Sequence, residues 1–104
     1  MIVFASPSRA ALSQVSEEGG SPEPLTELDA SLGETSHREP QLLPGGYAVL
    51  FKTEGPGGDD NQIWVYSLMT GERHRLVEDA RFATFSPSGH LVYVQDGNLH
   101  SRAF

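Results

Sequence analysis

The feature that most constrains the fold of this chain is a phrase that occurs twice. The sequence LLPGGYAVLF at residues 42–51 returns as FSPSGHLVYV at residues 85–94. Both copies contain a Pro-x-Gly turn followed by a short apolar run, which is typical of a tight turn leading into a β-strand. When Pro44 is aligned with Pro87, an offset of 43 positions, the apolar residues of the two runs correspond: Val49 with Val92, and Leu50 with Tyr93. The repetition indicates a chain built from structural repeats.

A second pair of segments repeats in the same manner. The sequence LSQVSEEGGSPEPL at residues 12–25 aligns without a gap with IWVYSLMTGERHRL at residues 63–76. A chance likeness between two generic hairpins is the alternative explanation, and the ungapped match with shared turn chemistry argues against it. The matched positions are apolar or glycine: Leu12 with Ile63, Val15 with Tyr66, Gly20 with Gly71, and Leu25 with Leu76. The two repeats together divide the chain into three copies of one unit.

A period of about 40 to 50 residues, with about four short strands in each repeat, is the signature of a β-propeller blade. The middle copy supplies all four expected strands, at residues 40–43, 47–53, 62–67 and 72–77. The N-terminal copy supplies the last three, beginning with strands at residues 2–4 and 12–16, and the C-terminal copy supplies the first three, at residues 80–85, 91–95 and 99–104. The sequence therefore predicts an all-β fold, a partial β-propeller of antiparallel four-stranded blades.

The expected organisation is a single partial propeller over residues 1–104, with a blade remnant at 1–28, a linker at 29–38, a full blade at 39–77 and a blade remnant at 80–104. Stacking has a physical reason, because one blade has two faces and cannot cover either of them alone. The polar linker and the glycine-rich acidic segment at residues 54–61 are expected to face solvent. The Asp96-Gly97-Asn98 sequence predicts a tight hairpin turn.

Residues 36–51, SHREPQLLPGGYAVLF, resemble the blade phrase of TolB-like propellers attached to bacterial serine/threonine protein kinases. In those propellers the usual motif is Ser-His-Arg-Trp-Pro-Gln, followed by Leu-Pro-Gly-Gly-Lys and an apolar strand. Glu39 stands where that family usually has Trp, and Tyr47 stands where it usually has Lys. The resemblance covers essentially the whole chain, and similar repeats occur in the periplasmic component of the Tol-Pal system and in propellers of prolyl oligopeptidase relatives. Such propellers close with about six blades, so a chain of about two and a half blades resembles a fragment.

The resemblance implies a non-enzymatic binding or sensor module for a protein or ligand, as part of a larger protein such as a receptor-type kinase. It also suggests a periplasmic, extracytoplasmic or membrane-tethered parent. Two alternatives stay open, an accessory propeller of a serine peptidase and a structural remnant with no independent function. The expected partner is another protein or a second copy, bound through the open edges and faces of the unclosed blades.

The histidines show no spacing typical of metal ligands, since no His-x-His or His-x-x-x-His pair is present. Their positions are His37, His74, His90 and His100. His37 lies in the family phrase and is expected to be a hydrogen-bonded structural group, whereas His74 and His90 are expected at exposed strand positions.

The remaining candidates for chemistry also favour structural roles. The Asp59-Asp60-Asn61 loop has carboxylates that a hard cation could use, but its spacing fits no calcium loop, and a solvated loop is the prediction. Trp64 is expected to pack between blades rather than against a ligand. No Gly-x-Ser-x-Gly motif or phosphate-binding glycine loop is present. We therefore expect no enzymatic activity, no catalytic or metal-binding residues, and no cofactor.

The net charge of −7 argues against nucleic-acid binding, which requires a clustered positive surface, and against binding to anionic membranes. No window approaches the length of apolar sequence that spans a bilayer, so no membrane insertion by this chain is expected. The absence of cysteine excludes disulfides and thiolate metal sites, and it leaves the cellular compartment open.

Overall fold

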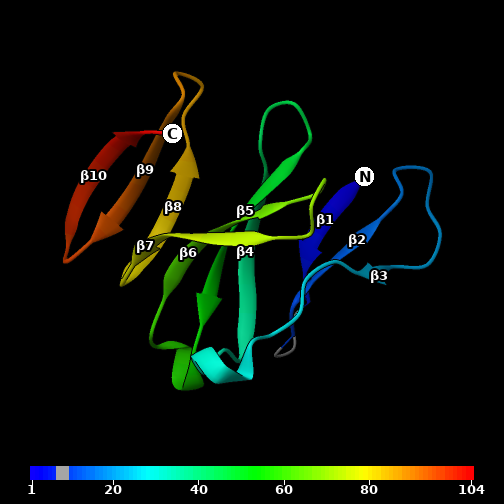
Figure 1. Cartoon of the computed structure of the whole chain (residues 1–104), viewed down its shortest axis with the longest axis horizontal. Helices are drawn as coiled ribbons and strands as arrows, with labels where there is room; N and C mark the ends of the chain where they lie inside the picture. The colour runs from blue at the N-terminus through cyan, green and yellow to red at the C-terminus, as the bar shows by residue number, and fades with distance from the viewer. Residues whose placement is uncertain (7–9) are drawn as a thin grey trace.

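The computed structural model describes residues 1–6 and 10–104, and this part of the chain is all-β, as predicted. Its ten strands form three antiparallel sheets that lie side by side (Figure 1). The helical segments in the described part are single 3₁₀ turns, η1 (Ala30–Leu32) and η2 (Pro56–Gly58). Neither the described residues 1–6 nor 10–104 include a helix with the length and apolar character needed to cross a membrane.

Each sheet pairs its strands in chain order. The N-terminal sheet contains β1 (Ile2–Ala5), β2 (Leu12–Val15) and β3 (Glu23–Pro24). The central sheet contains β4 (Ser36–Leu42), β5 (Ala48–Glu54), β6 (Gln62–Ser67) and β7 (Arg73–Glu78). The C-terminal sheet contains β8 (Ala80–Phe85), β9 (His90–Gln95) and β10 (Asn98–Ala103). The predicted strands are confirmed to within one or two residues, except at β4.

The strand β4 begins at Ser36, four positions before the predicted start at residue 40, so the last three residues of the expected linker belong to the central sheet. The same region was expected to face solvent, yet Ser36 and His37 are buried. The register of β4 against β5 shifts between Arg38 and Gln41, which marks a β-bulge. Pro40 lies inside the bulge and lacks the backbone N–H that a β-ladder needs. Because a proline normally limits a strand, the sequence predicts a strand that only starts at this residue.

Glu39, which stands where the propellers that residues 36–51 resemble usually have Trp, lies within this bulge. Its backbone has a φ of +53°, and its side chain points to solvent. The Glu39 carboxylate lies 3.6 Å from Lys52 Nζ on the neighbouring strand. The bulge thus directs the Glu39 carboxylate toward solvent, and β4 continues on both sides of the bulge.

The central sheet is the middle layer of the three. In β5, the consecutive residues Val49, Leu50 and Phe51 are each at most 1% exposed. Because successive side chains of a strand point to opposite faces, both faces of this sheet must be covered. The face toward the N-terminal sheet packs Val49, Phe51 and Trp64 against Leu12, which confirms the predicted position of Trp64 between two sheets.

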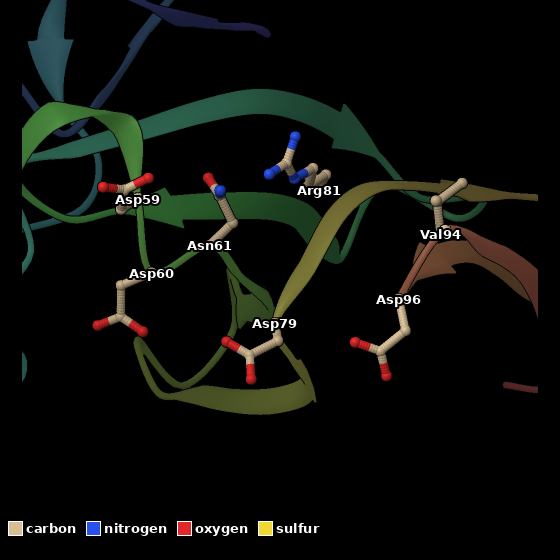
Figure 2. A pocket seen from close by; sticks show the side chains of 8 residues that line it. Asp59, Asp60, Asn61, Asp79, Arg81, Val94 and Asp96 are labelled. Atoms are coloured by element: carbon tan, nitrogen blue, oxygen red, sulfur yellow. The ribbon is translucent and has the colours of Figure 1, made fainter.

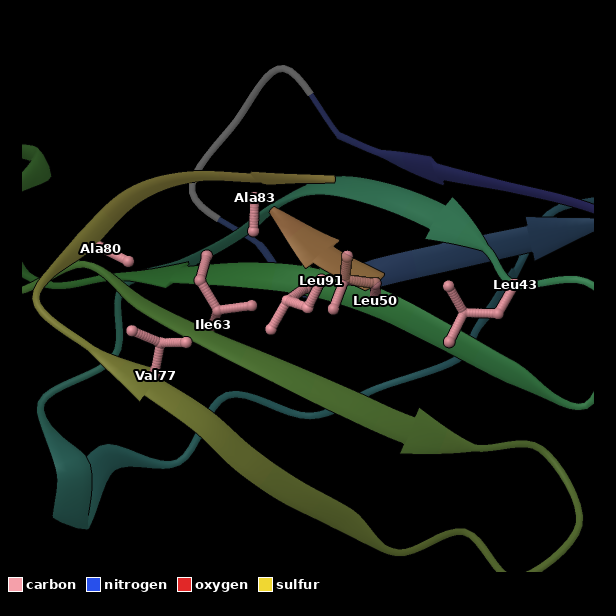
Figure 3. Close-up of a cluster of buried hydrophobic side chains, with 7 residues drawn as sticks. All are labelled: Leu43, Leu50, Ile63, Val77, Ala80, Ala83 and Leu91. Atoms are coloured by element: carbon pink, nitrogen blue, oxygen red, sulfur yellow. The ribbon is translucent and has the colours of Figure 1, made fainter. Parts of the chain in front are cut away.

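The opposite face of the central sheet packs against the C-terminal sheet. Leu50 and Ile63 contact Ala83 and Leu91 there, in the cluster drawn in Figure 3. Gln41 of β4 adds polar contacts between the same two sheets: its side-chain amide donates to the Ala83 carbonyl at 2.7 Å and accepts from Thr84 Oγ1 at 3.0 Å.

The register of β9 differs by one residue from the alignment that the sequence suggests. In the central sheet Leu42 pairs with Val49, and in the C-terminal sheet Phe85 pairs with Leu91. Since Phe85 is the equivalent of Leu42, Leu91 rather than Val92 corresponds to Val49. The β4–β5 connection is one residue longer than the β8–β9 connection.

This one-residue difference decides which side chains are buried, because a shift of one position moves a side chain to the other face. Leu91 and Tyr93 face the central sheet, whereas Val92 and Val94 face away from it. With the corrected register, each sheet turns the equivalent face toward the sheet that precedes it in the chain.

Candidate functional site

A buried polar network joins the N-terminal sheet to the central sheet. At its centre is His37 on β4, whose side chain is 0% exposed. Its Nδ1 lies 2.8 Å from Oγ1 of Thr26, just after β3, and its Nε2 lies 2.7 Å from Oε1 of Glu34, in the segment before β4. His37 is therefore hydrogen-bonded, as predicted from the sequence, whereas its burial is a correction to the expected solvent-facing linker.

The hydrogen bonds of the network fix its proton positions. An ionised Glu34 carboxylate can only accept, so Nε2 of His37 carries a proton and donates it. Burial lowers the pKa of His37 and outweighs the hydrogen bond and charge of Glu34, which raise it, while the Arg73 charge lowers it further. The ring is therefore neutral near pH 7, and its Nδ1 accepts. The Thr26 hydroxyl donates to Nδ1 while its oxygen accepts from the Leu12 backbone N–H at 2.9 Å.

Arg73 on β7 closes the network. Its guanidinium donates two hydrogen bonds to Glu34, at 3.1 Å to Oε1 and 2.7 Å to Oε2, and its Cζ lies 4.3 Å above the Trp64 ring centroid. Burial would raise the pKa of Glu34, but hydrogen bonds from Arg73 and His37 outweigh it and hold this pKa below its usual value. The ionised carboxylate thus joins β4 to β7, because Glu34 lies three positions before His37 and 39 positions before Arg73.

The Thr26–His37–Glu34 order matches the hydroxyl, imidazole and carboxylate of a nucleophile, base and orienting group. Thr26 is only 6% exposed, and its oxygen already accepts the Leu12 N–H. This geometry commits the hydroxyl to two internal hydrogen bonds and supports a structural role for the three residues. From the sequence only His37 drew notice, since nothing local marks Thr26 or Glu34 as its partners.

The network predicts that acid destabilises the fold. The unfolded chain protonates His37 near its ordinary pKa of 6.5, while the folded chain resists protonation until lower pH. The unfolded state therefore binds more protons than the folded state just below pH 6.5. The free energy of unfolding decreases as the pH is lowered through this range, by at most about 1.4 kcal/mol per pH unit for one proton. The lowered pKa of Glu34 adds an effect of the same sign below its ordinary value of 4.5.

Urea denaturation at a series of pH values measures this effect. We expect His37→Asn to flatten the stability curve between about pH 7 and 5.5. His74→Asn, at an exposed position on β7, is the matched control and should keep the wild-type slope. A wild-type curve that is flat over this range contradicts the assignment.

A shallow acidic depression of about 420 Å³ lies where the central and C-terminal sheets meet. Figure 2 shows the carboxylates of Asp60, Asp79 and Asp96 spread along its rim, with Arg81 above them. These aspartates have φ values of +56°, +53° and +52°, a backbone conformation that short polar side chains tolerate in turns. Within residues 1–6 and 10–104, no group of three His, Cys, Asp or Glu side chains is placed to hold a metal ion.

The other histidines lie apart from the network. His74 on β7 and His90 on β9 are exposed, as predicted. His100 on β10 is exposed as well and stacks on Tyr93, with 5.3 Å between ring centroids. The structure therefore does not bring the four histidines together.

The outward faces of the two terminal sheets are apolar. On the N-terminal sheet Ile2 pairs with Val15, and Phe4 lies on the same face, opposite to the residues that pack on the central sheet. On the C-terminal sheet, Phe82, Val94 and Leu99 form a row across three strands, with Val92 beside it. Ile2 is 50% exposed, Phe82 46% and Leu99 73%. We call these surfaces the N-face and the C-face, and none of the residues named on them is charged.

Comparison with known proteins found no matching protein-family model, no matching curated protein and no matching solved structure.

Proposed function

We propose that this chain is a non-enzymatic protein-binding module, a partial β-propeller whose N-face and C-face dock further blades. One observation carries the proposal: Val92 and Leu99 on the C-face and Ile2 and Phe4 on the N-face occupy strand positions whose equivalents in the central sheet are buried between sheets. Exposed apolar patches of this kind mark interaction surfaces in soluble proteins. The stacking of three repeated sheets supports the propeller interpretation, because blades of a propeller stack in this manner.

The resemblance of residues 36–51 to the propellers of bacterial receptor-type kinases supports a more specific setting. In that setting the module belongs to the sensor part of a larger protein, and the added blades come from the remainder of that protein or from a partner. The buried network around His37 then has a structural task, to hold the first sheet against the second.

The proposal is tested by offering the C-face one more blade. A second copy of residues 29–78 is fused after Phe104, and thermal unfolding and hydrogen exchange are measured. We expect one cooperative transition, raised by about 5 °C or more, because the new sheet covers Val92, Val94 and Leu99. The β10 amides should become protected from exchange.

The matched control carries Leu99→Asp in the same fusion, which places a charge in the new contact and should remove the gain. Two separate transitions, with unchanged exchange in β9 and β10, would show that the C-face does not accept a blade and would contradict the proposal.

A further inference from the structure

We infer that the chain associates with further copies of itself head to tail, the C-face of one copy packing on the N-face of the next. This inference rests on the proposed function and names the partner that supplies the next blade. It follows from the direction in which the three sheets stack.

The stacking direction is the same at both contacts within the chain. The central sheet turns Val49 and Phe51 toward the sheet that precedes it, and Leu50 and Ile63 toward the sheet that follows it. The C-terminal sheet likewise turns Leu91 toward the preceding sheet. Each sheet therefore has a preceding-side face and a following-side face, and only unlike faces meet.

The C-face is a following-side face that no sheet of residues 1–6 and 10–104 covers. In the corrected register, Val92 is the equivalent of Leu50, and Leu99 is the equivalent of Ile63. Leu50 and Ile63 are each 1% exposed, whereas Leu99 is 73% exposed. Val92 and Leu99 are apolar, as Leu50 and Ile63 are. They differ from Leu50 and Ile63 in that no sheet of the described residues covers them.

The N-face is a preceding-side face left uncovered by the three sheets of the described part of the chain. Its Ile2–Val15 pair is the equivalent of the Val49–Tyr66 pair in the central sheet, and Phe4 is the equivalent of Phe51. Val49 is 0% exposed and Phe51 is 1% exposed, whereas Ile2 is 50% exposed. The layer missing over this face is a following-side face.

A second copy presents the face that each end lacks. The C-face of one copy and the N-face of another are the two halves of a contact that already occurs twice inside the chain. The named residues of both faces are uncharged although the chain has a net charge of −7, so these side chains bring no charge of their own into the contact. A contact between unlike faces is heterologous, and it produces a ring or an open chain of copies.

Sedimentation velocity of the full chain, from about 1 to 100 μM at physiological salt, measures the association. The N-face variant is Ile2→Asp, and the C-face variant is Leu99→Asp. Met69→Asp is the matched control, because Met69 is 76% exposed and lies in the turn after β6, outside both faces. Circular dichroism establishes that each variant is folded.

We expect the wild type and Met69→Asp to associate, and each face variant alone to associate at least about tenfold more weakly, since its only available contact includes an aspartate. An equimolar mixture of the two face variants should form a dimer. In that mixture the intact C-face of Ile2→Asp meets the intact N-face of Leu99→Asp.

A monomeric wild type overturns the inference, and so does a mixture that stays monomeric. A face variant that associates alone as strongly as the wild type also overturns it, because this indicates contact between like faces. If an aspartate variant fails to fold, Ile2→Ser and Phe82→Ser repeat the test with a milder change. A monomeric wild type that is still stabilised by the fused blade would refute the second copy as partner and leave the proposed function standing.

Discussion

Replacing Glu34 by alanine will lower the free energy of unfolding by about 3 kcal/mol, because it leaves His37, Arg73 and the Asp29 backbone N–H without their acceptor. The Glu34 side chain is 4% exposed and accepts from His37 Nε2 and from both terminal nitrogens of Arg73. Arg73 is 18% exposed, so water partly compensates its loss, and this places the effect at the lower end of the range for buried ion pairs. Urea denaturation followed by the fluorescence of Trp64, the single tryptophan, measures it.

Two further variants define what the Glu34 effect reports. Glu34→Gln keeps an acceptor for His37 but loses the charge that pairs with Arg73, so its cost should fall between those of the wild type and the alanine variant. Glu17→Ala removes an acidic side chain that is 76% exposed and bonded to the N-terminal amine, and it should change stability much less than Glu34→Ala, because solvent screens an exposed ion pair. Equal effects of Glu17→Ala and Glu34→Ala would show that the buried network adds nothing to stability.

Replacing Phe51 by alanine will cost about 3 to 5 kcal/mol, which is a large fraction of the stability of a small domain. Phe51 is 1% exposed in β5 and packs with Leu12 and Trp64 between two sheets. Its ring centroid also lies 4.9 Å from that of His37. The substitution therefore opens a cavity beside the polar network, and we expect it to weaken the packing of the N-terminal sheet on the central sheet.

The comparison for Phe51 is Tyr47→Ala, which removes an aromatic ring that is 64% exposed. That change should cost below about 1 kcal/mol. Hydrogen exchange on the Phe51→Ala variant should show the earliest loss of protection in β1 and β2. Exchange that rises first in β9 and β10 instead would mean that Phe51 does not hold the N-terminal sheet.

The positions of most strands follow from the sequence alone. Alternating apolar residues specify a strand locally, and Gly or Pro specify the turn that ends it. The Asp96-Gly97 turn is a clear case: both residues have positive φ, +52° and +75°, and Gln95 pairs with Asn98 across them. The continuous apolar run of Val49 to Phe51 likewise indicates a strand that is covered on both faces.

The partners of His37 and the register of β9 were decided only by the tertiary structure. Arg73 lies 39 positions after Glu34 in the chain and meets it within the central sheet, whereas Thr26 reaches His37 because the N-terminal sheet packs on the central sheet. The register of β9 depends on the length of the β8–β9 turn, which is one residue shorter than the β4–β5 turn. The turn residues of the sequence do not specify this difference in length. That single residue reverses which side chains point inward, because the period of a strand is two. The sequence by itself thus determined where the strands and turns lie, since those signals are local. Packing between the sheets determined which face of each strand is buried, the bulge at Glu39 and the buried network, since those depend on residues that only the fold brings together.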